Sequence, residues 1–173
     1  RPLIGEEEID AVAAVMRTGM IAQGPQVAAF EDEFAAALVP GTRAVAVNSG
    51  TSALHLGLLA ARIGPGDEVI VPSFTFAATA NSVAITGATP VFADIDPLTF
   101  TLSPAAVEAA ITPRTRAIMP VHLYGHPAPM DVLQAIADSH GLMVFEDAAQ
   151  AHGASLHGRA VGSFGTFAAF SFY

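Results

Sequence analysis

Short apolar runs alternate with helix-like patterns along almost the whole chain, and this alternation limits the folds that the chain can adopt. Runs typical of strands lie at residues 44–47, 68–71, 90–93, 116–119, 142–145 and 166–172. Helices are predicted at residues 6–18, 25–38, 51–63, 76–85 and 130–140, and after Ser103, which caps a helix that starts at Pro104. Repeated strand–helix units predict an α/β fold, a mostly parallel sheet with helices on both faces.

Composition narrows the class of protein further. Of the 173 residues, 52% are hydrophobic and 13% are charged, which favours one sizeable core over a disordered chain. The net charge of −9, with no basic patch or basic helix, argues against nucleic acid or an anionic membrane as a partner. There is no cysteine and no histidine set with metal-ligand spacing, so we expect neither disulfides nor a metal site.

The location of the protein depends on two further observations. No signal peptide is visible before the acidic run at residues 6–8, so together with the lack of cysteine we expect a cytoplasmic protein. Residues 69–93 carry no charge, and this segment is long enough to suggest a membrane-spanning helix. Pro72, Asn81 and Pro90 interrupt this segment, which favours a buried strand–helix–strand unit instead.

In parallel sheets, ligands bind at the carboxyl ends of the strands, and the first candidate site lies at such a position. Residues 48–52 read Asn-Ser-Gly-Thr-Ser between a predicted strand and a predicted helix. Gly50 permits a tight turn, the first helical amides face outward, and Thr51 and Ser52 add hydroxyls. The turn therefore suits a phosphate group, although plain helix capping explains the same residues.

Two carboxylates follow the predicted strand 142–145. A carboxylate at a strand end can keep a ring nitrogen protonated, because a buried pair of opposite charges favours the charged form of both partners. If the strand continues, Glu146 and Asp147 point to opposite faces, so only one of them serves the site. Gln150 could lie beside Asp147 on one helical turn. A solvated acid at a strand end is the alternative.

Aromatic and histidine side chains follow two more predicted strands. Phe74 or Phe76 could stack on a planar ring, or both could belong to the core. His122 and Tyr124 could contact a substrate, or they could form a hydrogen-bonded structural pair.

Taken together, these segments resemble the sugar aminotransferases of the DegT/DnrJ/EryC1/StrS family, which are pyridoxal-phosphate enzymes of fold type I. The matching segments occur in the family's order over nearly the whole chain: GMIAQGP (19–25), NSGTSAL (48–54), GPGDEVI (64–70), PSFTF (72–76), GATPV (87–91), VHLYG (121–125), EDAAQ (146–150) and FSF (170–172). One such segment is a weak signal, whereas the ordered set is specific.

The resemblance implies a role for each matching residue. Asp147 would pair with the pyridinium nitrogen, Gln150 would bond near the 3-oxygen of the ring, and Phe76 would stack on its face. The phosphate would be bound by Thr51, Ser52 and Ser171, with help from the backbone amides of Gly50 and Thr51.

The resemblance also sets expectations for a longer protein. The chain contains no lysine, and the Schiff-base lysine is expected three residues beyond Tyr173. Residues 1–173 would be the N-terminal arm and most of the pyridoxal-phosphate-binding large domain, with the small C-terminal domain outside the sequence. A homodimer with shared active sites is expected.

Three functions remain open at this point. The first is amino transfer from an amino acid such as glutamate to a nucleotide-linked keto-sugar. The second is a sugar dehydratase of the same lineage, with histidine in place of the lysine. The third is a cofactor-binding or regulatory module without turnover.

Overall fold

In this computed structural model, residues 3–173 are described, and the chain divides into two compact units between Ala46 and Val47. Arg1 and Pro2, which belong to the predicted N-terminal arm, lie outside the described residues. The first unit contains two helices, α1 (Glu6–Thr18) and α2 (Pro25–Leu38).

Both helices of the first unit have the bounds that the sequence predicts, for visible reasons. The first turn of α1 carries three acidic residues, and the carboxylate of Glu8 accepts a hydrogen bond from the amide of Gly5 at 2.7 Å. The helix ends at Gly19, whose φ of 74° is left-handed. Pro25 starts α2, where its lack of an amide hydrogen costs nothing.

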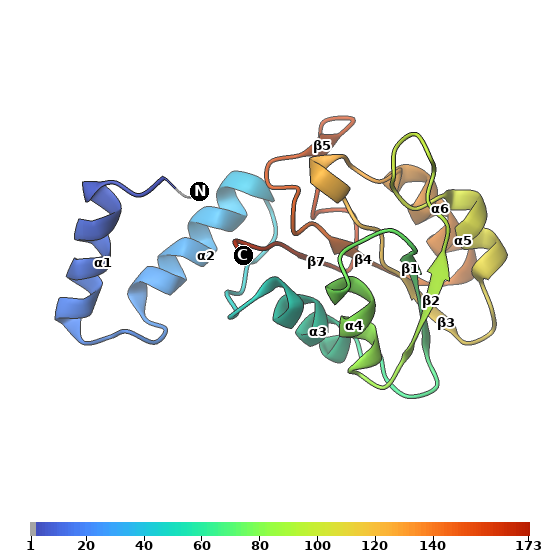
Figure 1. Cartoon of the computed structure of the whole chain (residues 1–173), viewed down its shortest axis with the longest axis horizontal. Helices are drawn as coiled ribbons and strands as arrows, with labels where there is room; N and C mark the ends of the chain where they lie inside the picture. Colours follow the sequence, from blue (N-terminus) through green and yellow to red (C-terminus); the bar gives the residue numbers. More distant parts are fainter. Residues whose placement is uncertain (1–2) are drawn as a thin grey trace. The chain divides into compact units, whose positions relative to one another are not determined.

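The second unit is built on a five-stranded sheet in which every pair of neighbours is parallel (Figure 1). Its strands, in spatial order, are β2 (Thr89–Ala93), β1 (Glu68–Pro72), β3 (Thr115–Ile118), β4 (Met143–Asp147) and β7 (Phe167–Ala169). The predicted parallel α/β sheet is therefore confirmed.

Side chains on alternate strand positions build a core on each side of this sheet. On β1, Val69 and Val71 join the cluster that contains Leu58 of α3 (Gly50–Ala60) and Val83 of α4 (Ala78–Ala84). Ile70 points the other way, into the cluster of α5 (Pro104–Ala110) and α6 (Met130–His140). Helices thus cover both faces, as the continuous apolar strands predict.

One close contact joins α3 to the sheet. A Cβ placed on Gly57 would lie 2.4–2.7 Å from ring atoms of Phe167, so any larger residue would force the ring or the helix to shift. The ring of Phe167 also stacks on Phe145, with centroids 4.6 Å apart. Gly57 therefore sets how closely α3 approaches β7.

The helices predicted at 51–63 and 76–85 and the strand predicted at 166–172 are shorter in the structure. Three larger differences from the predicted secondary structure also occur. Residues 44–47 form no strand, because a strand needs a ladder partner and the amide of Ala46 donates instead to Glu31 Oε1 at 2.7 Å. Ser103 occupies the N-cap of α5 but makes no side-chain cap bond. The antiparallel hairpin of β5 (Ser155–Leu156) and β6 (Arg159–Ala160) was not predicted; its turn places His157 and Gly158 at φ 51° and 80°.

The uncharged segment 69–93 folds as most of β1, then α4 and β2, which is the strand–helix–strand unit that its proline and asparagine residues favour. Among the residues that the structure describes, no helix is long and apolar enough to cross a bilayer.

Candidate functional site

The carboxyl ends of the parallel strands bring the predicted site residues to one edge of the sheet. Asp147 ends β4 and is in register with Ala169, the last residue of β7. Beyond that pair, the amide of Ala148 donates to the carbonyl of Ala169 at 2.8 Å. Ser171 follows two residues later, so Asp147 and Ser171 lie at the same edge.

Gly50 connects this edge to the start of α3. A Cβ on Gly50 would lie 2.8 Å from Cβ and 3.0 Å from Oγ of Ser171. Only glycine lets the hydroxyl of Ser171 approach the first turn of the helix so closely. The result is a small polar cradle formed by a helix N-terminus and a serine from the far end of the sequence.

The first turn of α3 leaves donors for a ligand. Ser49 is the N-cap, and its Oγ accepts from the amide of Ser52 at 3.1 Å. The first intrahelical bond runs from Ala53 to the Ser49 carbonyl, so the amides of Gly50 and Thr51 precede the helical ladder. Capping is performed by Ser49, and within residues 3–173 the Thr51 hydroxyl has no hydrogen-bond partner. This geometry fits an anion such as phosphate.

Asp147 is almost completely buried, with 5% of its surface exposed. Oδ2 accepts from the hydroxyl of Thr79 at 2.7 Å, and Oδ1 accepts from the amide of Ala149 at 3.2 Å. Burial raises the pKa of Asp147, and these two bonds offset only part of that effect. In the described part of the chain no arginine or histidine forms an ion pair with it. The carboxylate therefore favours a cationic partner at the sheet edge.

Glu146 points away from Asp147, and groups of the protein donate hydrogen bonds to both of its carboxylate oxygens. Its Oε1 accepts from the amides of Phe164 and Gly165 at 2.7 and 2.8 Å. Its Oε2 accepts from the amide of Gly162 at 2.7 Å and from His122 Nε2 at 3.1 Å. Burial alone would raise the pKa of Glu146, but the bonds from His122, Gly162 and Gly165 outweigh it, and the pKa lies below its usual value.

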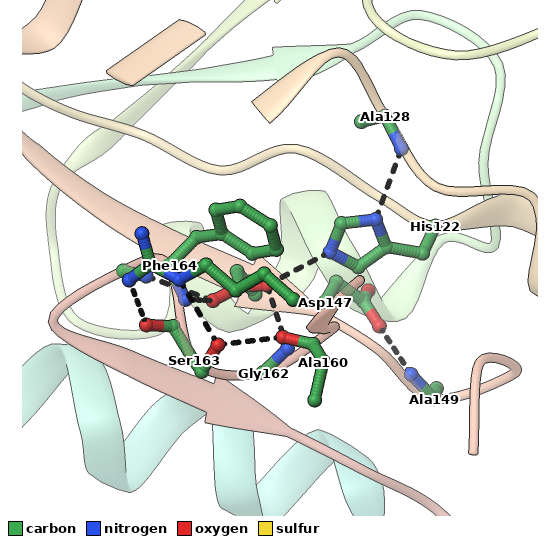
Figure 2. Close-up of polar contacts among 11 residues, drawn as sticks. His122, Ala128, Asp147, Ala149, Ala160, Gly162, Ser163 and Phe164 are labelled. Atoms are coloured by element: carbon green, nitrogen blue, oxygen red, sulfur yellow. Dashed lines mark hydrogen bonds and ion pairs between the residues drawn. The ribbon is translucent and has the colours of Figure 1, made fainter. Parts of the chain in front are cut away.

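His122 is fully buried, and both of its ring nitrogens are occupied (Figure 2). The amide of Ala128 donates to Nδ1 at 3.0 Å, so Nδ1 carries no proton and Nε2–H donates to Glu146. His122 also holds the strand end, because its amide donates to the carbonyl of Asp147 at 3.0 Å. A direct substrate contact by this ring would require one of these bonds to break.

Gln150 lies in a turn after β4 and not on the helical turn that was predicted. Its Oε1 accepts a hydrogen bond from the amide of Tyr124 at 2.8 Å. The Nε2 amide group of Gln150 can therefore donate to another group. Tyr124 is exposed and has a left-handed φ of 54°. Tyr124, Gln150 and Ser171 line one shallow, open pocket, together with His152.

The two phenylalanines that follow β1 are at the surface. Phe76 is 77% exposed, and Phe74 is half exposed with its ring 5.9 Å from that of Phe100. The alternative that both belong to the core is therefore wrong. An exposed phenylalanine beside α4 is available to stack on a flat ring.

The structure thus brings Gly50, Ser171, Asp147, Gln150 and Tyr124 to one edge, while His122 is enclosed behind it. Sequence reasoning missed Thr79, the partner of Asp147. No local pattern pointed to Thr79, because it lies 68 positions from Asp147 in the sequence. The alternative of a solvated acid at this strand end is wrong for both Glu146 and Asp147, because both are buried.

A model of the DegT/DnrJ/EryC1/StrS aminotransferase family matches residues 2–173 of the chain. The spore coat polysaccharide biosynthesis protein SpsC of Bacillus subtilis (strain 168) is 53% identical over 172 residues, which is 99% of this chain and 44% of that protein. A dTDP-3-amino-3,4,6-trideoxy-alpha-D-glucose transaminase of Streptomyces venezuelae is 55% identical over 94% of this chain and 43% of its own length. The chain therefore spans less than half the length of these relatives.

Solved structures agree with this match. S. venezuelae DesV, solved in complex with a ketimine intermediate, superposes with a TM-score of 0.89 at 53% identity, over 97% of this chain and 46% of that one. The PLP-form of the putative sugar aminotransferase Spr1654 from Streptococcus pneumoniae has a TM-score of 0.95 at 34% identity, over 99% of this chain and 47% of its own.

Proposed function

This chain belongs to the DegT/DnrJ/EryC1/StrS aminotransferase family, whose cofactor is pyridoxal phosphate, and from this premise we propose a specific activity for the whole protein. The protein moves an amino group from an amino acid, with glutamate as donor, to a nucleotide-linked keto-sugar. When bound, pyridoxal phosphate supplies an electron sink that acidifies the proton on the substrate carbon bearing the amino group.

The residues of the sheet edge fit the two ends of that cofactor. Asp147 is the buried carboxylate that would hold a proton on the ring nitrogen, since it has no cationic partner of its own among residues 3–173. The amides of Gly50 and Thr51, with the hydroxyls of Thr51, Ser52 and Ser171, would bind the phosphate at the N-terminus of α3.

Two further side chains would orient the ring between these ends. Gln150 would donate from Nε2 to the ring's 3-oxygen, because its Oε1 is already engaged by Tyr124. Phe76 would cover one face of the ring. We place the Schiff-base lysine, which would move the substrate proton, in the protein beyond Tyr173.

The observation that carries this proposal is the juxtaposition, at one sheet edge, of the Asp147 carboxylate and the cradle between Gly50 and Ser171. A capping turn alone would not need a serine from the segment after β7 packed against Gly50, and a purely structural acid would be enclosed by donors as Glu146 is. We also propose a homodimer in which each site uses residues of both subunits, and a cytoplasmic location.

The test uses the full-length protein with pyridoxal phosphate, 15N-labelled glutamate and a panel of nucleotide-linked keto-sugars. We expect 2-oxoglutarate and a labelled amino sugar, both measured by mass spectrometry. A deoxygenated sugar without label would identify the dehydratase instead. Cofactor binding without either product would identify the module without turnover.

The phosphate turn is tested separately by the double variant Thr51→Ala, Ser52→Ala. We expect about tenfold weaker binding of pyridoxal phosphate or more, since two hydroxyl donors to a charged group are lost. Thr89→Ala is the matched control, because Thr89 is also exposed but lies at the amino end of β2, the opposite edge of the sheet. Unchanged affinity in the double variant would leave the turn with a capping role only.

A further inference from the structure

Thr79 is a fully buried hydroxyl residue on α4 that the proposed function does not yet use. Its Oγ1 lies 2.7 Å from Asp147 Oδ2 and 3.0 Å from the hydroxyl of Thr75. An ionised carboxylate only accepts hydrogen bonds, so the proton of Thr79 goes to Asp147. The oxygen of Thr79 then accepts from Thr75, which gives a directed chain from Thr75 through Thr79 to Asp147.

Two independent elements hold the Asp147 carboxylate in place. Thr79 donates to Oδ2 from α4, and the amide of Ala149 donates to Oδ1 from the turn after β4. With one donor on each oxygen, rotation of the carboxylate about its last bond breaks a bond on either side. Threonine keeps two χ1 rotamers in a helix, and the bonds of the Thr79 hydroxyl to Thr75 and Asp147 favour one of them.

The hydrogen bonds from Thr75 through Thr79 to Asp147 also extend to the loop that carries the exposed Phe76. Thr75 directly precedes Phe76, and its hydroxyl is tied to Thr79. The groups assigned to the ring's nitrogen and to its face are therefore linked through Thr79. Hydrogen bonds in such a chain strengthen one another.

Resting on the proposed function above, we propose that Thr79 is a positioning residue of the cofactor site: its hydroxyl holds the Asp147 carboxylate in the orientation that pairs with a protonated ring nitrogen. Thr79 acts through Asp147 and does not touch the cofactor. The other ionisable groups around Asp147 in the described residues are Glu146, which faces the opposite side of β4, and His122, whose ring nitrogens are engaged by Glu146 and Ala128.

The hydroxyl also matters for the charge of Asp147. Burial raises the pKa of this carboxyl group, and the hydrogen bond from Thr79 is the largest of the effects that lower it. Loss of the hydroxyl therefore raises the pKa of Asp147 further. The ionised form that a ring nitrogen needs would then be reached only at higher pH.

The experiment compares Thr79→Val, which keeps the shape and removes the hydroxyl, with Thr79→Ser, which keeps the hydroxyl and removes the methyl group, in the full-length protein. The first readout is a 13C NMR titration of the Asp147 carboxyl in the apoprotein, assigned by its absence in Asp147→Asn. The second is the affinity for pyridoxal phosphate. The third is the 15N chemical shift of the ring nitrogen in labelled, bound cofactor.

In Thr79→Val we expect Asp147 to titrate at higher pH than in wild type, the cofactor to bind about tenfold more weakly, as for one hydrogen bond to a charged group, and the ring nitrogen to lose its protonated signal at neutral pH. Thr79→Ser should restore all three. Ser82→Ala is the matched control, because Ser82 is buried on the same helix but bonds to the Thr79 carbonyl.

An unchanged titration and affinity in Thr79→Val would overturn the inference, and so would a serine variant that behaves like the valine variant, since that would implicate the methyl group. None of the three readouts requires turnover. A protein that transfers no amino group to any sugar, yet shows these three changes, would refute the proposed function and leave the positioning role standing.

Discussion

Glu146 and Asp147 are neighbours on one strand, both are buried carboxylates, and the protein treats them in opposite ways. Glu146 receives four hydrogen bonds, from His122, Gly162, Phe164 and Gly165, and its pKa lies below the usual value. Asp147 receives two, from Thr79 and Ala149, and burial leaves its pKa raised. A buried acid whose oxygens are all engaged by the protein fits a structural role, whereas a buried acid with fewer donors and a raised pKa is a candidate for binding a ligand, as we propose for Asp147.

The largest effect is expected at Glu146. Glu146→Gln places an amide NH2 against two N–H donors whichever way the amide is turned, and His122 cannot relieve this because its Nδ1 must accept from Ala128. We expect unfolding to become easier by about 3 kcal/mol, measured by urea unfolding of the full-length protein. Glu108→Gln, on the exposed face of α5, is the control. Equal stability of Glu146→Gln and wild type would remove the distinction between the two acids.

Asp147→Asn is the reciprocal change, and it should affect turnover. The amide has the shape of the carboxylate but cannot hold a proton on a ring nitrogen. We expect kcat/KM for amino transfer to fall by about 100-fold or more, the size of effect seen when one electrostatic group of an active site is removed. The melting temperature of the apoprotein should not fall. Near-normal turnover in this variant would show that Asp147 is not the electrostatic partner of the cofactor.

A second contrast lies along α3, between Gly57 and Gly50. In Gly57→Ala the new Cβ meets the ring of Phe167, and we expect a loss of about 1–3 kcal/mol in stability from overpacking. In Gly50→Ala it meets Ser171, and we expect about tenfold weaker binding of pyridoxal phosphate with a smaller change in stability, since the hydroxyl of Ser171 is displaced. If the two variants lost affinity and stability in the same proportion, Gly50 would be a packing residue like Gly57.

The smallest effect concerns pH and has opposite signs at the two acids. The lowered pKa of Glu146 in the folded state adds stability above its unfolded pKa, and this is lost as pH falls through the folded value. The raised pKa of Asp147 does the reverse, since its ionisation costs stability as pH rises through the folded value.

Apoprotein carrying Asp147→Asn should therefore match wild type in acid and be slightly more stable at neutral pH. Pyridoxal phosphate should reverse that order, because only wild type gains the ion pair. Thermal melts of both full-length proteins across pH, with and without cofactor, measure the difference. A variant less stable than wild type at neutral pH without cofactor would contradict the view that Asp147 lacks a cationic partner in the described residues.

Much of the fold follows from local signals. The helices at 6–18 and 130–140 have the predicted bounds because Gly19 and Gly141 end them in left-handed conformations. The prediction of a strand at 44–47 is wrong, because a strand needs a neighbouring strand to pair with, and the pattern of apolar residues does not reveal whether one is present.

The candidate site divides in the same way. The residues at the strand ends could be predicted from motif order, and their roles stay predictions. The enclosure of Glu146 could not be predicted, since three of its donors are backbone amides of Gly162, Phe164 and Gly165, a group that almost every residue carries. Nor could the bond between Thr79 and Asp147, which are 68 positions apart in the sequence.

The most direct test is a crystal structure of the full-length protein with pyridoxal phosphate bound. It should place the ring nitrogen about 2.7–2.9 Å from a carboxylate oxygen of Asp147, with the phosphate against Gly50, Thr51 and Ser171 and the carboxylate of Glu146 still inside its four donors. A cofactor whose ring nitrogen faces solvent or another side chain, with Asp147 unengaged, would contradict the account.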